Sequence, residues 1–222
     1  DDTADVALAL LLVTMRRLHA GERELRAGAW SGWRPTHHPG VTCTGKTLGI
    51  VGFGRIGQAV ARRAHLGLGM RVRYVSRRAH PDDAARDAAL GAEPCASLDE
   101  LLATSDAVSL HCPATPETRH LIDAAALARM RPDAVLVNTA RGDVVDEAAL
   151  VEALAAGRLA AAGLDVFEHE PRLHPGLLAL DNVVLIPHLG SATVETRRAM
   201  GMRAVDNVEA WLDGRPLPDR VA

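Results

Sequence analysis

A short apolar segment followed by three closely spaced glycines constrains the fold of this 222-residue chain more than any other feature. Residues 47–51 are typical of a buried strand, and Gly52, Gly54 and Gly57 follow as G-x-G-x-x-G before a helical run over 58–64. The first glycine allows the tight turn, the second lets a pyrophosphate approach the backbone, and the third lets helix and strand pack closely. The helix start offers free N–H groups to phosphate. We expect a bound dinucleotide here; a turn without a ligand is less favoured, because strand and helix flank the motif.

The rest of the chain alternates between short apolar runs and helical patterns. We expect strands over 47–52, 71–76, 106–111, 134–139, 160–166 and 183–187, and helices over 55–66, 97–103, 123–129, 146–156 and 191–213. Apolar strands separated by helices predict a parallel sheet covered on both faces, that is, a doubly wound α/β fold of the Rossmann type. Before it, residues 3–19 predict one buried helix, and residues 20–45 predict an irregular arm that contains Trp30 and Trp33.

Composition excludes several classes of protein. The net charge of −3 gives no basic face for nucleic acid, and the apolar run over 6–13 is too short to span a bilayer. The three cysteines are odd in number and dispersed, which indicates a reduced, cytoplasmic protein and no zinc site of the kind found in zinc-dependent dehydrogenases. We therefore predict no metal centre.

The sequence context excludes two other functional assignments, a phosphate-binding loop and a short-chain dehydrogenase site. Residues 40–47 match the phosphate-binding pattern G-x-x-x-x-G-K-T, but they follow an irregular segment and open a strand, whereas that pattern requires a preceding strand and a following helix. A short-chain dehydrogenase needs Tyr-x-x-x-Lys, and the only tyrosine, Tyr74, and the only lysine, Lys46, stand in the wrong order and spacing.

The end of the second expected strand bears on which dinucleotide binds. An acidic residue about 20 positions after the glycine loop holds the ribose of NAD, but this strand ends in Ser76, Arg77 and Arg78. A hydroxyl and two guanidinium groups suit a 2′-phosphate. We expect NADP(H) to be preferred, with NAD(H) as the alternative; the competing interpretation is a solvated arginine pair.

Three polar residues follow three later strands. Arg141 follows 135–140, Glu170 follows 163–167, and His188 follows 184–187. The carboxyl ends of parallel strands meet at the ligand-binding edge of a doubly wound sheet. Arginine can clamp a carboxylate, histidine can exchange a proton while hydride moves, and glutamate can hold the imidazole. Singly each is a surface group; together they predict a catalytic site.

These residues resemble the D-isomer-specific 2-hydroxyacid dehydrogenase family. The resemblance covers essentially the whole chain through motifs at 3–17, 45–57, 109–120, 138–142, 163–171 and 187–191. It implies that Arg141 binds the substrate carboxylate and carbonyl, that His188 is the acid/base and that Glu170 is its carboxylate partner. It implies that Arg55 and Ile56 meet the pyrophosphate. The implied cofactor-binding residues are Gly52, Gly54, Arg55, Ile56, Gly57, Ser76, Arg77, Arg78, His111, Cys112, Pro113, Thr118, Thr139, Ala140, Arg141, Asp165, His188 and Gly190.

Within that set the resemblance implies finer positions. His111, Pro113 and Thr118 would line the adenosine side, Asp165 and Thr139 would lie near the nicotinamide carboxamide, and Gly190 would lie beside the cofactor. We read Cys112 as a packing residue. The Ser-Arg-Arg sequence at 76–78 resembles the NADPH-preferring glyoxylate/hydroxypyruvate reductase branch, and Glu170 argues against formate dehydrogenase, which has glutamine there.

The resemblance also implies the domain organisation and the partners. Residues 1–190 would form the dinucleotide-binding domain, with an interdomain helix at 3–19 and a dimer arm at 20–45, and 191–222 would return to a substrate lobe. Nothing before residue 3 corresponds to the family's N-terminal lobe, so we expect this chain alone to bind NADPH and to be catalytically weak. A small 2-oxo or 2-hydroxy acid is the expected substrate and a homodimer the expected assembly, although Trp30 and Trp33 would equally suit the chain's own core. The alternative function is a non-catalytic dinucleotide sensor, as in related corepressors.

Overall fold

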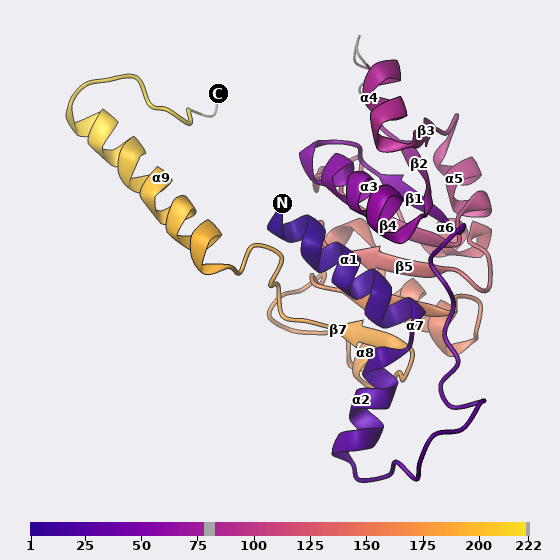
Figure 1. Cartoon of the computed structure of the whole chain (residues 1–222). Helices are drawn as coiled ribbons and strands as arrows, with labels where there is room; N and C mark the ends of the chain where they lie inside the picture. Colours follow the sequence, from indigo (N-terminus) through magenta and orange to yellow (C-terminus); the bar gives the residue numbers. More distant parts are fainter. Residues whose placement is uncertain (78–82, 221–222) are drawn as a thin grey trace.

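A seven-stranded, fully parallel sheet forms the centre of the molecule (Figure 1). The structure is a computed structural model that describes residues 1–77 and 83–220, so Arg78 lies outside the described residues. Within these, the strand order is β3-β2-β1-β4-β5-β6-β7. The chain therefore has the doubly wound α/β fold that its sequence predicts. The strands are β1 Thr47–Val51, β2 Arg71–Val75, β3 Ala92–Pro94, β4 Ala107–Leu110, β5 Val135–Asn138, β6 Ala161–Leu164 and β7 Val183–Leu185.

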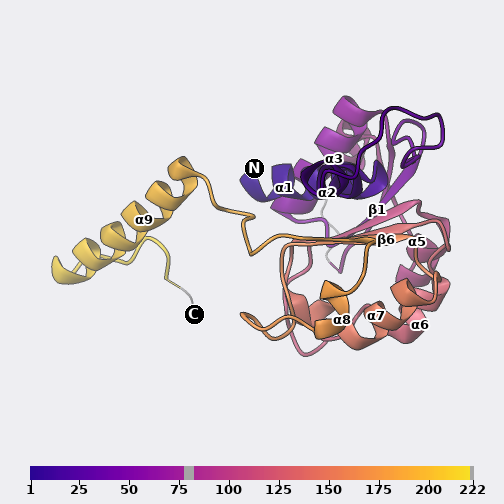
Figure 2. The ribbon, with the colours of Figure 1, turned by 90° about the horizontal axis from the view of Figure 1, so that it is seen from below.

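Helices cover both faces of the sheet (Figure 2). One face carries α1 and α3, and the other carries α5, α6, α7 and α8. In β5, the side chains of Val135 and Val137 join the core under α1 and α3, whereas Leu136 joins the core on the opposite face. This alternation explains why the strand is apolar at every position. The helices are α1 Asp2–Met15, α2 Leu18–Arg26, α3 Arg55–Leu68, α4 Asp83–Leu90, α5 Leu98–Thr104, α6 Ala124–Arg129, α7 Glu147–Ala155, α8 Pro175–Leu178 and α9 Val194–Leu212, with a 3-10 turn η1 at Gly142–Val144.

The N-terminal region differs from its prediction. The expected single helix over 3–19 is wrong, because α1 ends at Met15 and Arg17 takes a left-handed backbone with φ 52° before α2 begins. Burial explains the break: α1 is apolar and packs on β5 and β6, whereas α2 is polar and has no buried residue. The expected irregular arm over 20–45 is also wrong at its start, since residues 20–26 belong to α2.

Four short elements were not expected. They are α4, β3, the 3-10 turn η1 and α8. β3 is only three residues long and forms because Ala92, Glu93 and Pro94 pair with β2. Tertiary pairing thus supplies what local sequence preference does not.

The irregular arm and α9 expose large apolar side chains. Trp33 is 80% exposed and Trp30 is 51% exposed, so neither tryptophan covers the chain's own core. Helix α9 extends away from the sheet (Figure 1), and Ala210 is its only buried residue. None of the helices in the described part of the chain combines the length and apolarity needed to cross a bilayer.

Candidate active site

The glycine loop connects β1 to α3 at the point where the strand order reverses, between β1 and β4. Gly52 has φ 92°, and a Cβ placed on it would lie 2.7 Å from the backbone nitrogen of Cys112. A Cβ on Gly57 would lie 2.2 Å from the Gly52 carbonyl oxygen. A Cβ on Gly54 would meet nothing within 4 Å. The first and third glycines are therefore required by the protein's own packing, and the second leaves open space beside the start of α3.

A cavity of about 730 Å³ opens beside this loop. The carboxyl ends of β1, β2 and β4 border it, which is the edge where doubly wound sheets bind ligands. It is lined by eight of the residues expected to bind the cofactor: Gly52, Gly54, Ser76, Arg77, His111, Cys112, Pro113 and Thr118.

The remaining expected cofactor residues that the structure describes lie outside the lining of this cavity. Arg55 and Ile56 are exposed in the first turn of α3, where backbone N–H groups have no capping side chain. Gly57 is buried beneath the loop. The others follow β5, β6 and β7: Thr139, Ala140, Arg141, Asp165, His188 and Gly190.

Several cavity residues were not expected from the sequence. Phe53, Gln58, Arg86, Ser97 and Glu117 all line the cavity. Phe53 and Gln58 could have been found from their place inside or just after the glycine motif. Arg86 and Ser97 carry no such signal, because they come from α4 and from the residue before α5.

One side of the cavity carries the positive charge expected for a 2′-phosphate. Arg77 Nη1 lies 4.0 Å from Glu117 Oε2, and both side chains are more than half exposed. An exposed ion pair of this length contributes little free energy. Arg77 can therefore exchange Glu117 for an anionic ligand at small cost.

His111 and Thr118 serve the cavity in different ways. Burial lowers the pKa of His111 to about 4, so this imidazole is neutral at pH 7. Its Nε2 lies 2.8 Å from Ser109 Oγ, and its buried Nδ1 has no hydrogen-bond partner among the described residues. Thr118 Oγ1 instead donates to the Pro113 carbonyl at 2.6 Å and accepts from the Thr115 N–H at 2.8 Å. Thr118 thus orders the loop after β4.

A histidine–glutamate pair lies beyond the carboxyl ends of β6 and β7. His188 Nδ1 and Glu170 Oε2 are 2.9 Å apart, and Glu170 Oε1 accepts the Phe167 N–H at 3.0 Å. Partial burial raises the pKa of the Glu170 carboxyl, but these two hydrogen bonds and the nearby charges of His188 and Arg141 outweigh it and hold the pKa below its ordinary value. Glu170 is therefore an ionised acceptor at neutral pH, and it orients the imidazole.

Arg141 lies in a turn shaped by Asn138. The Asn138 side chain accepts the Ala140 N–H at 3.0 Å and donates to the Arg141 carbonyl at 2.9 Å. The Arg141 backbone is thereby fixed while its side chain remains exposed. Gly142 must be glycine, because a Cβ there would lie 1.9 Å from the backbone of Phe167. The turn that carries Arg141 therefore packs against the segment that leads to Glu170.

Asp165 anchors the segment after His188. Its Oδ1 accepts the Leu189 N–H at 2.5 Å and its Oδ2 accepts the Gly190 N–H at 2.8 Å, and the residue is 1% exposed. His188 itself has φ 54°, an uncommon backbone conformation for a residue with a side chain. The carboxylate holds the turn that makes this conformation stable. The family resemblance implies that Asp165 lies near the cofactor, but it does not reveal this positioning contact.

The segment resembling a phosphate-binding loop has a structural role, as its context predicted. Residues 40–46 lead into β1 and not into a helix. Lys46 Nζ pairs with Asp106 Oδ1 at 3.1 Å, next to the start of β4. The lysine is engaged at the amino end of the sheet, opposite the cavity.

Comparison with known proteins establishes the family. Residues 8–190 match the model for "D-isomer specific 2-hydroxyacid dehydrogenase, NAD binding domain". The chain belongs to the D-isomer-specific 2-hydroxyacid dehydrogenase family. The glycine loop and the His188–Glu170 pair described above both fall inside the matched residues.

Relatives within this dehydrogenase family are similar over nearly the whole chain. Glyoxylate reductase from Thermococcus onnurineus is 50% identical over 99% of this chain, and glyoxylate/hydroxypyruvate reductase B from Serratia proteamaculans is 47% identical over 96%. The chain spans about 65% of the length of each relative. An NADPH-dependent glyoxylate/hydroxypyruvate reductase from Sinorhizobium meliloti, solved with NADP and malonate, superposes with a TM-score of 0.89 at 39% identity, covering 100% of this chain and 67% of that one.

Proposed function

We propose that this dehydrogenase-family chain takes part in reducing a small 2-oxo acid, glyoxylate or hydroxypyruvate, with NADP(H) as the preferred cofactor. The observation that supports the proposal most directly is the hydrogen bond between His188 and Glu170, in a site where the charge of Arg141 also acts on Glu170. The three groups come from three separate strand ends. A proton donor, an ionised partner and a guanidinium are the set that reduction of a carboxylate-bearing ketone requires.

The residues at the edge of the sheet fit a nicotinamide dinucleotide. Space beside Gly54 and the uncapped start of α3 would hold the pyrophosphate. At this edge of the sheet, the buried atoms His111 Nδ1 and Thr139 Oγ1 lack a hydrogen-bond partner among the described residues, and each would gain one from a polar ligand. When bound, such a cofactor supplies or accepts the hydride.

The chain's own groups would manage the substrate and the proton. With Glu170 accepting a hydrogen bond at Nδ1, the opposite ring nitrogen of His188, Nε2, is the atom that would give a proton to the substrate oxygen or take one from it. Arg141 would bind the substrate carboxylate through paired N–H donors. Asp165 would act as a positioning residue, because it holds the backbone that follows His188.

The residues at the end of β2 support the proposed preference for NADP(H). Ser76 and Arg77 line the cavity, and neither supplies the carboxylate that holds the ribose of NAD in this fold. The Sinorhizobium meliloti relative is named as NADPH-dependent and was solved with NADP. Arg78, expected to be the second guanidinium, lies outside the described residues.

Turnover assays test this proposal. Oxidation of NADPH and of NADH is followed by the absorbance of the reduced nicotinamide, with glyoxylate, hydroxypyruvate and pyruvate as substrates. The assays use the full-length protein from the same gene, because the chain spans only about 65% of its relatives. We expect the highest kcat/KM with NADPH and glyoxylate or hydroxypyruvate. Tight NADPH binding without turnover of any 2-oxo acid would contradict the proposal and would identify a dinucleotide sensor instead.

We also propose a homodimer in the cytoplasm. The exposed Trp30 and Trp33 of the arm support a dimer, because exposed aromatic side chains are enriched at protein interfaces. The three unpaired cysteines suit a reducing compartment. The exposed apolar residues of α9 support its proposed return to a separate substrate lobe. Light scattering during size exclusion tests the dimer, and a monomeric mass would contradict it.

A further inference from the structure

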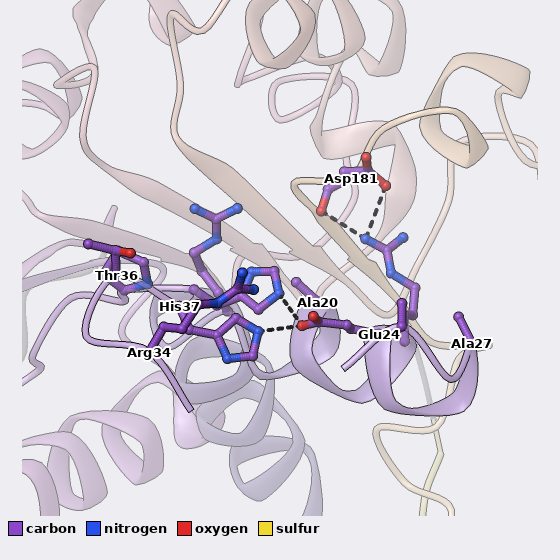
Figure 3. A pocket seen from close by; sticks show the side chains of 12 residues that line it. Ala20, Glu24, Ala27, Arg34, Thr36, His37 and Asp181 are labelled. Atoms are coloured by element: carbon purple, nitrogen blue, oxygen red, sulfur yellow. Dashed lines mark hydrogen bonds and ion pairs between the residues drawn. The ribbon is translucent and has the colours of Figure 1, made fainter. Parts of the chain in front are cut away.

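A second cluster of chemically capable side chains lies far from the cofactor cavity, on the arm between α2 and β1. Figure 3 shows the imidazole of His37 directed at the carboxylate of Glu24, which projects from α2. His38 Nε2 lies 2.9 Å from Glu24 Oε2, and His37 Nε2 contacts the same oxygen. The ligand atoms of all three residues lie within 4.8 Å of one another. None of the functions proposed above uses these side chains.

The backbone is arranged so that both histidines face the same point. Successive side chains of an extended segment point to opposite sides. His38 has φ 45°, in the left-handed region, and this turns its ring onto the side of His37, with the ring centroids 4.6 Å apart. A non-glycine residue in this region is uncommon and requires compensating contacts. Here the compensating contact is the one to Glu24.

The three side chains are also partly withdrawn from solvent. Their exposed fractions are 17% for Glu24, 18% for His37 and 32% for His38. Two imidazoles and one carboxylate form a ligand set that suits Zn²⁺, whereas Mg²⁺ and Ca²⁺ prefer oxygen ligands throughout. Zinc bonds of about 2.0–2.2 Å would require the three ligand atoms to separate slightly from their hydrogen-bond spacing. The side chains alone can supply that shift.

The surrounding charge is mixed. Arg17, Arg23 and Arg34 line the same cavity of about 790 Å³. Asp181 compensates one of them, since its Oδ1 lies 3.1 Å from Arg23 Nη2. The remaining guanidinium groups disfavour cations that bind by charge alone, so imidazole coordination must supply the affinity. They also favour an anion at a fourth coordination position.

The sequence predicts no metal centre, because it does not reveal that the fold brings Glu24, His37 and His38 together. We propose, against that prediction, that these three residues form a binding site for one Zn²⁺ ion, which joins the arm to α2. The ion would replace hydrogen bonds between the arm and the helix with coordination bonds. The site would therefore be structural in effect, and distinct from the cofactor cavity.

Calorimetric titration of the 222-residue chain with Zn²⁺, after removal of metals by a chelator, tests the proposal. We expect one equivalent to bind, and each of Glu24→Gln, His37→Gln and His38→Gln to weaken binding at least about tenfold, since even loss of a residue that only supports a ligand costs 10–100-fold. Glutamine keeps the size and hydrogen-bonding capacity of the side chains. Unfolding temperatures measured in the presence of chelator establish that each variant folds. If a histidine variant does not fold, Zn²⁺ binding by Glu24→Gln tests the proposal.

Two matched controls remove imidazoles elsewhere. His65→Gln changes a histidine that belongs to no such cluster among the described residues, and His188→Gln removes the imidazole that pairs with Glu170 at the candidate active site. Both should bind Zn²⁺ as the unmodified chain does. Co²⁺ should give the visible absorption of a four-coordinate site, and His37→Gln should lose it. Absence of stoichiometric binding, unchanged binding in the three cluster variants, or loss of binding in His188→Gln would overturn the proposal.

Discussion

The cofactor cavity and the His188–Glu170 pair lie at the same edge of one sheet, but they are built differently. The cavity depends on backbone: Gly52 and Gly57 are required by close contacts, and Gly54 leaves room for a ligand. The pair depends on side chains that are 18 residues apart and are held by other side chains. Backbone sites tolerate few substitutions locally, whereas side-chain sites can be lost through a residue that never touches the ligand. Binding and chemistry should therefore be separable by mutation.

Among the variants that leave His188 in place, the largest expected effect follows from removing the guanidinium of Arg141. Arg141→Ala should lower kcat/KM for the 2-oxo acid about 10²–10³-fold, because a charged donor to the reacting group is lost. NADPH affinity, measured by nucleotide fluorescence, should stay within about twofold. Arg158→Ala, on a distant turn, is the control. Equal losses of NADPH affinity and turnover would show that the two regions are not separable.

Substitution of Asp165, whose carboxylate fixes the backbone that follows His188, should have the next largest effect. Asp165→Asn replaces a carboxylate that accepts two backbone N–H groups with an amide that can accept through only one oxygen. We expect a loss of about 1–3 kcal/mol in unfolding free energy and a lower kcat, because the turn carrying His188 loosens. Chemical denaturation and steady-state kinetics measure the two. A stable variant with unchanged kcat would refute the positioning role.

The sequence predicts the cofactor cavity, which depends on backbone, better than the His188–Glu170 pair, which depends on side chains. The glycine spacing alone predicts the turn, the helix and the place of the cavity. The proposed catalytic roles of Arg141, Glu170 and His188 come from their positions at strand ends and from the family resemblance. The hydrogen bonds of Asn138 and Asp165 depend on three-dimensional contacts that no local pattern encodes. The break at Arg17 and strand β3 were missed for the same reason, since burial and pairing decide them. The Glu24–His37–His38 cluster depends on a left-handed residue that the sequence does not reveal.

A smaller effect is expected at the end of β2. Ser76→Asp places a carboxylate where the 2′-phosphate is proposed to bind, so repulsion should shift the NADPH/NADH ratio of kcat/KM toward NADH by at least about tenfold, or about 1.4 kcal/mol. Ser76→Asn, which adds similar bulk without charge, is the control. An unchanged ratio would argue against the 2′-phosphate site.

A further prediction concerns the pH dependence of stability and the cavity histidine, His111. Burial lowers the pKa of His111 from 6.5 to about 4. Above pH 6.5 the imidazole is neutral in the folded and unfolded states alike; between 6.5 and 4 the unfolded chain binds a proton that the folded chain does not. The unfolding free energy should therefore decrease as the pH is lowered from 6.5 to 4, by up to about 1.4 kcal/mol per pH unit. His111→Asn should flatten this slope, whereas His65→Gln should keep it.

His188 is proposed to exchange a proton with the substrate, whereas the glycine loop is proposed to hold most of the cofactor, and one variant tests this division. His188→Gln, in the full-length protein, is compared with the unmodified enzyme for both kcat and the dissociation constant of NADPH. We expect kcat to fall about 10²–10⁴-fold, as for loss of a general acid, with NADPH affinity within about twofold. Unchanged kcat, or loss of NADPH affinity in proportion to kcat, would contradict the account.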